Sequence, residues 1–359
     1  MKSKHGGNIF ELSRRYGIDA ASIIDFSANI NPLGYSSRVR KALIREIDSI
    51  LNYPDVTSFE LVSGLSQYHG IVQDSILVGN GSTEFIYLIP VVFKPKKALI
   101  VVPSFSEYEN GLKMINCEVL YFQTTPETDF SIDIPALCST LEEGFDILYL
   151  CNPANPTGCL TATDDIRNII TCARKAGAIA VIDEVFIDFI EEVSVKRDVL
   201  RFDNLIVIRS VTKFFGIPGL RIGYIIASQP YIEKIRQNRP PWSVNALGEK
   251  AALEALSDKG YIKDTREYVR AEREFLRNEL DKIPGFKTYN SAANFLLVFM
   301  ESQIGMNAKE LAERLAQHGI LIRDCSNFQS LGHHYFRIAV KRHEENIVLI
   351  DRLKKAIRW

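Results

Sequence analysis

Lys213 is the residue of this chain best suited to covalent chemistry, because it lies in a short polar segment between the apolar runs 205–208 and 222–227. Burial and neighbouring cations lower the pKa of a lysine and free its nitrogen lone pair, so Lys213 is a candidate Schiff-base lysine. Ser210 and Arg221 flank it. At these spacings a hydroxyl and a planar guanidinium could bind one phosphate. A reactive amine beside a phosphate site predicts pyridoxal 5'-phosphate (PLP) as the cofactor.

Polar side chains also follow two apolar runs that are typical of strands. Asp183 follows the run 178–182, and open α/β sheets bind their ligands at this end of their strands. A buried carboxylate there could keep the pyridine nitrogen protonated, so that the ring remains an electron sink. Asn155 lies in a loop fixed by prolines and a glycine after the run 145–150, and its amide could reach the ring hydroxyl. Each residue alone has an ordinary structural explanation, so the prediction depends on their order and separation.

Short β-branched runs alternate with helix-length segments between about residues 75 and 230, which predicts a mostly parallel sheet with helices on both faces. The seven expected strands cover residues 76–78, 98–102, 119–122, 147–150, 178–182, 205–208 and 222–227. After the first of them, a glycine-containing turn leads into a helical stretch. The free N–H groups at this helix start could bind an anion, and they belong to Gly81, Ser82 and Thr83.

The chain changes character after residue 246, where segments rich in Ala, Glu, Lys and Leu predict long helices. Three further strands are expected at residues 294–299, 320–323 and 335–340, followed by a closing helix over 344–358. We therefore expect an N-terminal arm at 1–30, a large cofactor-binding domain at 31–246 and a small C-terminal α/β domain at 247–359.

Composition excludes several other classes of function. The chain has 43 Lys and Arg against 44 Asp and Glu, a formal charge of -1, which leaves no basic surface for nucleic acid. Its six cysteines include no Cys-x-x-Cys pair, and we expect reduced thiols in a cytoplasmic protein. The six histidines have no metal-binding spacing, so no metal is expected. The apolar runs are too short for a membrane span, and the N-terminus does not look like a signal peptide.

Nearly the whole chain resembles the fold-type I PLP enzymes of the class I/II aminotransferase group. Within that group it is similar to the histidinol-phosphate aminotransferase branch, and most closely to the threonine-phosphate decarboxylases of cobalamin biosynthesis. The resemblance rests on segments 5–9, 25–34, 53–55, 79–81, 183–189, 210–224, 241–247, 320–323 and 335–340. It implies an α/β fold with a mostly parallel seven-stranded sheet in the large domain.

The resemblance also implies roles for individual residues. The phosphate anchors match Gly81, Ser82, Thr83, Ser210 and Arg221. Tyr53 matches a tyrosine that reaches the cofactor phosphate of the neighbouring subunit, which implies a homodimer with shared active sites. Phe105 matches the aromatic residue stacked on the ring. One departure is Phe186, which stands where aminotransferases of this group commonly have a tyrosine that hydrogen-bonds the ring hydroxyl.

The substrate residues implied in the same way are two arginines and a set of hydrogen-bonding residues. Arg337 matches a residue that binds the α-carboxylate, and Arg323 one that binds a substrate phosphate. The remaining candidates are His5, Gly7, Asn31 and Asn155.

The resemblance therefore implies a PLP-dependent carboxy-lyase that converts L-threonine O-3-phosphate to (R)-1-amino-2-propanol O-2-phosphate. Transamination of histidinol phosphate and decarboxylation of serine phosphate remain alternatives, because residue types alone do not determine which bond at the α-carbon breaks. A PLP-binding transcription regulator is disfavoured, because the arm is short for a DNA-binding domain. A nicotinamide dehydrogenase is disfavoured by the absence of a dinucleotide fingerprint near Gly79.

Overall fold

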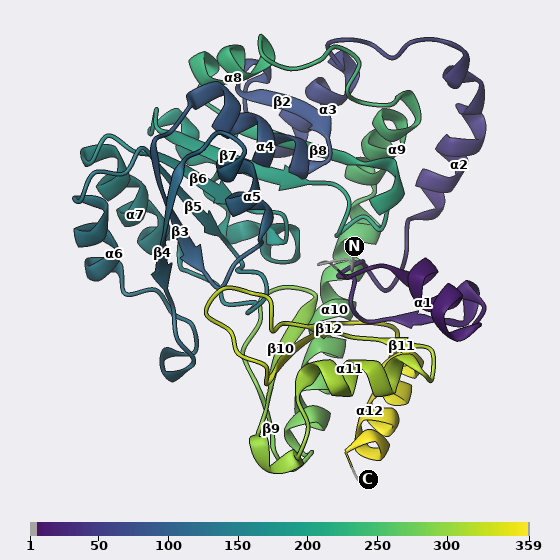
Figure 1. Cartoon of the computed structure of the whole chain (residues 1–359). Coiled ribbons are helices and arrows are strands. Elements are labelled where there is room, and N and C mark those ends of the chain that lie inside the picture. The colour runs from purple at the N-terminus through teal and green to yellow at the C-terminus, as the bar shows by residue number, and fades with distance from the viewer. Residues whose placement is uncertain (1–5, 358–359) are drawn as a thin grey trace.

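The computed structural model describes residues 6–357, which fold around a large and a small sheet (Figure 1). The large sheet has seven strands in the order β2-β8-β7-β6-β5-β3-β4. Neighbouring strands from β7 to β4 are parallel, whereas β8 is antiparallel to both β7 and β2. The strands are β2 (Ile76–Asn80), β3 (Lys97–Val102), β4 (Glu118–Gln123), β5 (Ile147–Cys151), β6 (Ile179–Asp183), β7 (Leu205–Ser210) and β8 (Ile222–Ala227). All seven predicted strands are confirmed.

Helices cover both faces of this sheet, because its central strands are apolar on both sides. In β5, Ile147 and Tyr149 face one helix layer, and Leu148 and Leu150 face the other. The first layer contains α4 (Ser82–Phe93), α5 (Glu107–Lys113) and α8 (Gln229–Arg236). The second contains α3 (Phe59–His69), α6 (Ile134–Leu141), α7 (Thr163–Lys175) and α9 (Ala246–Ser257).

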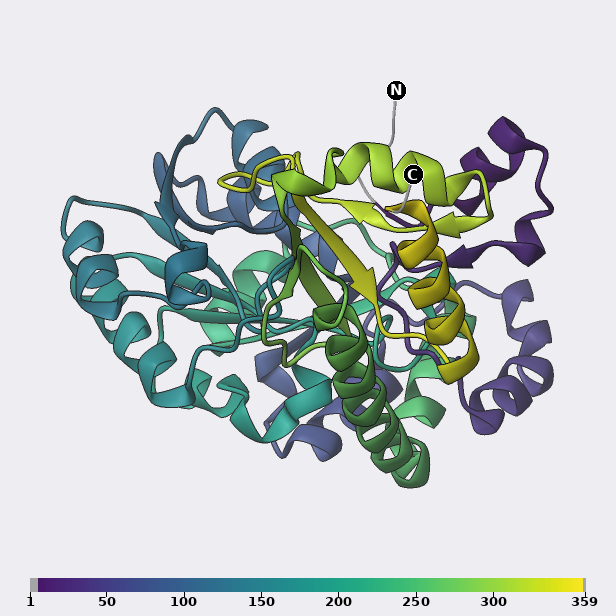
Figure 2. The same cartoon turned by 90° about the horizontal axis from the view of Figure 1, so that it is seen from below.

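The long helix α10 (Lys259–Asp281) runs from the large sheet into the C-terminal part of the chain (Figures 1 and 2). That part contains a four-stranded antiparallel sheet in the order β12-β13-β10-β9. Its strands are β9 (Phe286–Thr288), β10 (Phe295–Met300), β12 (Arg323–Asp324) and β13 (Tyr335–Ala339), and they pack against α10, α11 (Ala308–Ala316) and α12 (His343–Ala356). This is the small α/β domain that the sequence predicts.

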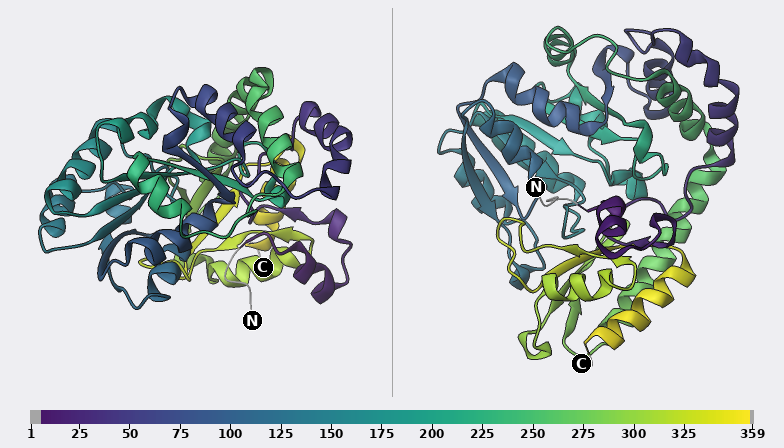
Figure 3. Two further views of the ribbon diagram at one scale, coloured as in Figure 1. Left: turned by 90° about the horizontal axis from the view of Figure 1, so that it is seen from above. Right: turned by 45° about the vertical axis from the view of Figure 1, so that its right-hand side comes forward.

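The N-terminal arm packs onto the small domain, beside the gap between the two sheets (Figure 3, right). Its elements are α1 (Ile9–Tyr16) and β1 (Ile24–Asp25), followed by α2 (Ser37–Arg45). β1 pairs in parallel with β11 (Ile320–Leu321). The sequence predicts a single strand over 320–323, but the structure has two short strands in different sheets. β11 pairs with β1, and after Ile322 the chain continues as β12, which pairs with β13. Short 3-10 turns complete the chain at Ala20–Ser22, Ile47–Leu51, Gln73–Ser75, Pro126–Thr128, Ile187–Val193, Lys196–Leu200, Pro218–Leu220 and Ser302–Ile304.

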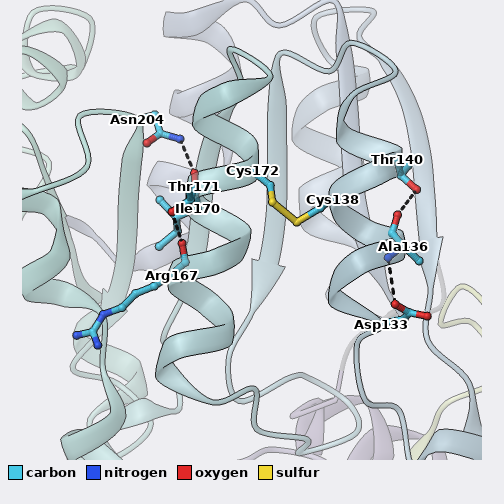
Figure 4. The surroundings of a disulfide bond; sticks show 9 residues. All are labelled: Asp133, Ala136, Cys138, Thr140, Arg167, Ile170, Thr171, Cys172 and Asn204. Atoms are coloured by element: carbon cyan, nitrogen blue, oxygen red, sulfur yellow. Dashed lines mark hydrogen bonds between the residues drawn. A yellow bond between two sulfur atoms is a disulfide. The ribbon is translucent and has the colours of Figure 1, made fainter.

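The expectation that all cysteines are reduced is not met. Cys138 of α6 and Cys172 of α7 form a disulfide between two adjacent helices, with their Cα atoms 5.4 Å apart (Figure 4). The pairing was not visible in the sequence because the two residues are 34 positions apart and become neighbours only when the helices pack. The four cysteines outside this bridge are free thiols. Over residues 6–357, no helix is long and apolar enough to cross a membrane.

Candidate active site

Lys213 lies in the loop after β7 and lines a cavity of about 220 Å³ at the carboxyl ends of the parallel strands. Its backbone carbonyl accepts a hydrogen bond from the Asn31 N–H, at 3.0 Å. Burial, together with the charges of Arg337 and Arg221, lowers the pKa of the Lys213 amine to about 8. A larger fraction of this amine is therefore neutral, and nucleophilic, near neutral pH than for a solvated lysine.

Asp183 ends β6 and faces the same cavity with a carboxylate that is held on both oxygens. Its Oδ2 accepts a hydrogen bond from the Tyr108 hydroxyl at 2.6 Å, and its Oδ1 accepts one from the Val185 N–H at 2.9 Å. Burial raises the Asp183 pKa to about 6, although both hydrogen bonds act in the opposite direction. Tyr108 is itself fixed by stacking on Tyr149, with ring centroids 5.2 Å apart. A buried, oriented carboxylate of this kind suits a cationic ring N–H.

A phosphate-sized cradle forms where α4 begins beside β8. Gly223 approaches so closely that a Cβ there would lie 2.2 Å from the backbone nitrogen of Ser82. Gly81 has a φ of 77°, and a Cβ on it would lie 2.5 Å from Nη2 of Arg221. Ser82, Thr83 and Arg221 line the cavity, so the helix N–H groups and a guanidinium are directed to one place. Only glycine fits at the two close approaches, which explains the residues at the turn.

Ser210, expected as a phosphate ligand, is buried and does not line the cavity. Its Oγ lies 2.7 Å from the Oγ1 of Thr212, and of these two residues Thr212 is the one that lines the cavity.

Asn155 and Arg337 meet across the gap between the two domains. Arg337, on β13, donates a hydrogen bond to Oδ1 of Asn155 in the loop after β5. It also donates to the carbonyl oxygen of Ser27 at 2.9 Å and lies over the ring of Phe295 at 5.2 Å. Only 6% of Arg337 is exposed, and burial lowers its pKa to about 10. The guanidinium is thus held in a defined position and faces the cavity.

Arg323 lies opposite Arg337 on the adjacent strand β12. Its Nη2 donates to Oδ1 of Asn327 at 2.8 Å, and its guanidinium lies 4.9 Å from the ring centroid of Phe328. Both arginines line the cavity. Two guanidiniums on paired strands suit a small molecule that carries two anionic groups.

Comparison with known proteins decides the family. Residues 21–353 match the model of the family described as aminotransferase class I and II. The chain belongs to this family. It is 39% identical to a putative threonine-phosphate decarboxylase of Caldanaerobacter subterraneus subsp. tengcongensis, over 98% of this chain and 93% of that protein. It is 36% identical to the threonine-phosphate decarboxylase of Salmonella typhimurium, over 99% and 97% respectively. The solved histidinol-phosphate aminotransferase of Clostridium acetobutylicum has a TM-score of 0.86 at 30% identity and covers 92% of this chain and 98% of its own.

This member of the class I and II aminotransferase family is therefore a PLP-dependent enzyme with the fold-type I architecture that the sequence predicted. The site fits the cofactor on its own evidence. It combines an amine of lowered pKa, a buried carboxylate at a strand end and a glycine-lined anion cradle.

Apolar side chains form the remaining walls of the active-site cavity. Phe105 lines the cavity and makes an edge contact with Tyr108, with ring centroids 5.9 Å apart. Phe186 also lines it and packs edge-on against Phe295, at 5.0 Å. Because Phe186 has no hydroxyl, Asn155 is the side chain at this end that can hydrogen-bond a ring oxygen.

Several expected site residues lie elsewhere in this single chain. Tyr53 is 83% exposed and contacts the ring of Trp242 rather than the cavity. Asn31 is buried, and its amide donates to the Phe214 carbonyl oxygen at 2.6 Å, so it supports the lysine segment instead of lining the cavity. Gly7 donates its N–H to Oγ of Ser27 at 2.8 Å. His5 lies outside the described residues.

The sequence analysis assigned no role to a further group of cavity residues, some of which lie within the matched segments. They are Gly6, Ser27, Asn29, Tyr108, Thr212, Asn327 and Phe328. Tyr108 lies in the first turn of α5, three residues after Phe105, which precedes that helix. This proximity to Phe105 was the one usable signal, but the Tyr108–Asp183 contact spans 75 positions in the sequence.

Proposed function

We propose that this enzyme decarboxylates L-threonine O-3-phosphate to (R)-1-amino-2-propanol O-2-phosphate, a step of cobalamin biosynthesis. The observation that carries the proposal is the pair Arg323 and Arg337 on adjacent strands of one cavity. A phosphorylated amino acid has two anionic ends that such a pair can bind at once. The similarity over nearly the full chain to two proteins named threonine-phosphate decarboxylase supports the same substrate.

When bound, PLP supplies an electron-poor ring that accepts the electron pair released at the substrate α-carbon. Arg337 would bind the α-carboxylate and Arg323 the phosphate, so the two arginines would hold the substrate at both ends and orient its carboxylate bond. Asp183 holds a proton on the ring nitrogen. Lys213 would hold the cofactor through its amine, and the same amine could supply a proton to the substrate α-carbon. Phe105, Phe186 and other apolar lining residues exclude water from the reacting atoms.

Product analysis tests this proposal against transamination. The holoenzyme is incubated with threonine phosphate, with and without 2-oxoglutarate, and the products are identified by mass spectrometry. We expect carbon dioxide and the amino alcohol phosphate without any keto acid. Turnover that requires 2-oxoglutarate would replace the proposal with the aminotransferase alternative, which the likeness to a histidinol-phosphate aminotransferase supports.

Serine phosphate is to be compared with threonine phosphate in the same assay. A single methyl group in an apolar pocket contributes only about 1–3 kcal/mol of discrimination. We expect threonine phosphate to be preferred by at least tenfold in kcat/KM. A preference for serine phosphate would shift the proposal to that substrate.

The enzyme is further proposed to act as a homodimer with shared sites. Large apolar side chains are exposed around Tyr53, which is unusual for a surface that faces only water. They are Ile44, Ile47, Ile50, Leu51, Val56 and Phe59, each at least 48% exposed. A partner seated there would bring its Tyr53 toward the cofactor phosphate of this subunit.

Complementation tests the shared site. Mixed dimers of a Lys213→Ala subunit and a Tyr53→Ala subunit should regain activity, because one of the two sites then has both residues intact. Absence of any gain on mixing, with subunit exchange verified, would contradict the shared site.

The cytoplasmic location and the domain boundaries at 30 and 246 are likewise proposals. A biosynthetic PLP enzyme is expected in the cytoplasm. Disulfides are rare in the cytoplasm, so the bridge between Cys138 and Cys172 bears on this location. The thiol content of the purified protein tests directly whether the bridge forms.

A further inference from the structure

A second cavity of about 660 Å³ lies where α10 passes the joint between the two domains. Its walls come from α10, from the loop after β4, and from the segments 158–160 and 290–292. It shares no lining residue with the active-site cavity. Nothing in the proposed reaction uses it.

Three arginines of α10 line this cavity. Arg270, Arg273 and Arg277 follow one another at intervals of three and four residues, so they lie on one face of the helix. Arg273 donates to the carbonyl oxygen of Ala293 at 2.7 Å, and Arg277 donates to Oδ1 of Asn290 at 2.6 Å. Both acceptors are neutral, so these contacts fix the directions of the guanidiniums without neutralising their charge.

None of the three arginines forms an ion pair with a carboxylate in the part of the chain that the structure describes. Within residues 6–357, no Asp or Glu oxygen lies within 4.0 Å of these guanidiniums, whereas other arginines of the chain form many such pairs. The cavity has two carboxylates of its own. Asp129 lies 3.7 Å from Lys287, and Glu274 is exposed and forms no ion pair in the described chain.

Crowding of like charges is visible in the electrostatics of the central arginine. Burial lowers the pKa of Arg273, the neighbouring charges of Arg277 and Arg270 act in the same direction, and the Glu274 carboxylate acts in the opposite direction. Such a group of partly buried cations is unfavourable unless an anion is bound among them, and the guanidinium fork matches the oxygens of a phosphate.

We propose that this arginine-lined cavity is an accessory binding site for a phosphate-class anion. Its position gives the anion a structural effect. The Ala292 N–H donates to the carbonyl oxygen of Gly158 at 2.9 Å, which joins the small domain to the loop that also carries Asn155. Gly158 has no room for a side chain, because a Cβ there would lie 2.2 Å from the Ser291 Oγ. An anion bound between α10 and this contact braces the joint three residues from Asn155.

Isothermal titration of the holoenzyme with inorganic pyrophosphate tests the proposal. The double variant Arg270→Gln/Arg277→Gln removes two charges from exposed and half-buried positions and should bind at least tenfold more weakly than the parent. The matched control is Arg174→Gln, an exposed arginine of α7 that pairs with Asp203 at 3.1 Å, which should bind like the parent. The variant Arg270→Lys/Arg277→Lys keeps the charge and should bind within about threefold of the parent.

A further variant separates this cavity from the active site. Arg323→Ala should retain the pyrophosphate affinity of the parent. Loss of binding in Arg323→Ala, equal affinity in the parent and the double Gln variant, or no binding to the parent at millimolar concentrations would each overturn the proposal. Titration with adenosine monophosphate and orthophosphate then identifies the form of the anion, since tighter binding of the former indicates a phosphate monoester and tighter binding of the latter a free phosphate.

Discussion

Arg323 and Arg337 should fail in different ways when each is replaced by alanine. Arg323 is proposed to bind the substrate phosphate, which free threonine does not have. A hydrogen bond to a charged group contributes about 1.5–3 kcal/mol, so two such bonds contribute about 3–6 kcal/mol. Arg323 must exchange its bond to Asn327 for the phosphate, at a cost of about 1 kcal/mol. The remaining energy, about 2–5 kcal/mol, corresponds to a loss of about 30- to 5000-fold in kcat/KM for threonine phosphate.

Arg337→Ala should reduce turnover of both substrates by a similar factor, because both carry the α-carboxylate. It should also increase slow side transamination, since the carboxylate bond is no longer held perpendicular to the ring. Arg323→Lys is the matched control, which retains the charge but loses the planar fork and should give an intermediate loss. The assay is kcat/KM on threonine phosphate and on threonine for all variants. Equal losses on the two substrates for Arg323→Ala would refute phosphate recognition by this residue.

Four further outcomes are expected. Lys213→Ala should abolish turnover and the absorbance of lysine-bound cofactor together; borohydride trapping and peptide mapping that locate the adduct on another lysine would contradict this. Because burial lowers the Lys213 pKa to about 8, the neutral amine becomes more abundant as pH rises through that value, so the rate at which apoenzyme takes up PLP covalently should increase between about pH 7 and 9 and level off above; a rate that is flat over this range would exclude the lowered pKa. Asp183→Ala should retain cofactor through its phosphate contacts but lose most activity, and kcat within about tenfold of the parent, equivalent to about 1.4 kcal/mol, would mean that this carboxylate does not hold the ring nitrogen. Replacing both Cys138 and Cys172 by serine should lower the free energy of unfolding by about 3–4 kcal/mol for a loop of 34 residues, measured against the parent under oxidising conditions, and no loss would indicate that the bridge is absent in solution.

The sequence predicted the strands and the residues at their carboxyl ends, because both are local properties. A buried strand is a short β-branched run, and its last residues face the ligand side of a parallel sheet. Asp183 and Lys213 were found in this way. Contacts made by packing were not available from such patterns. The Tyr108–Asp183 hydrogen bond and the disulfide join residues 75 and 34 positions apart.

Asn31 illustrates a further limit of sequence reasoning. The segment around it matches the family, which suggested a role at the substrate. The structure instead places its amide against the Phe214 carbonyl oxygen and Oγ1 of Thr265, at 2.6 and 3.0 Å. A short polar residue near a site can thus act on the ligand or on the backbone that carries the ligand, and residue type does not distinguish the two.

Because β1 pairs with β11, the residues of the active site fall into two groups. One group belongs to the small domain with the N-terminal arm, and the other belongs to the large domain. Phe26 donates its N–H to Leu321 and accepts from Ala339, both at 2.8 Å, so the arm is bound to the small domain at two points. Five residues further on, the Asn31 N–H donates to the backbone carbonyl of Lys213 in the large domain. Residues 28–30 therefore link the arm, which is bound to the small domain with the two arginines, to the segment that carries Lys213 in the large domain. Substitutions that change the amino acid substrate can therefore accumulate in the arm and the small domain, while the cofactor site and Lys213 in the large domain stay the same.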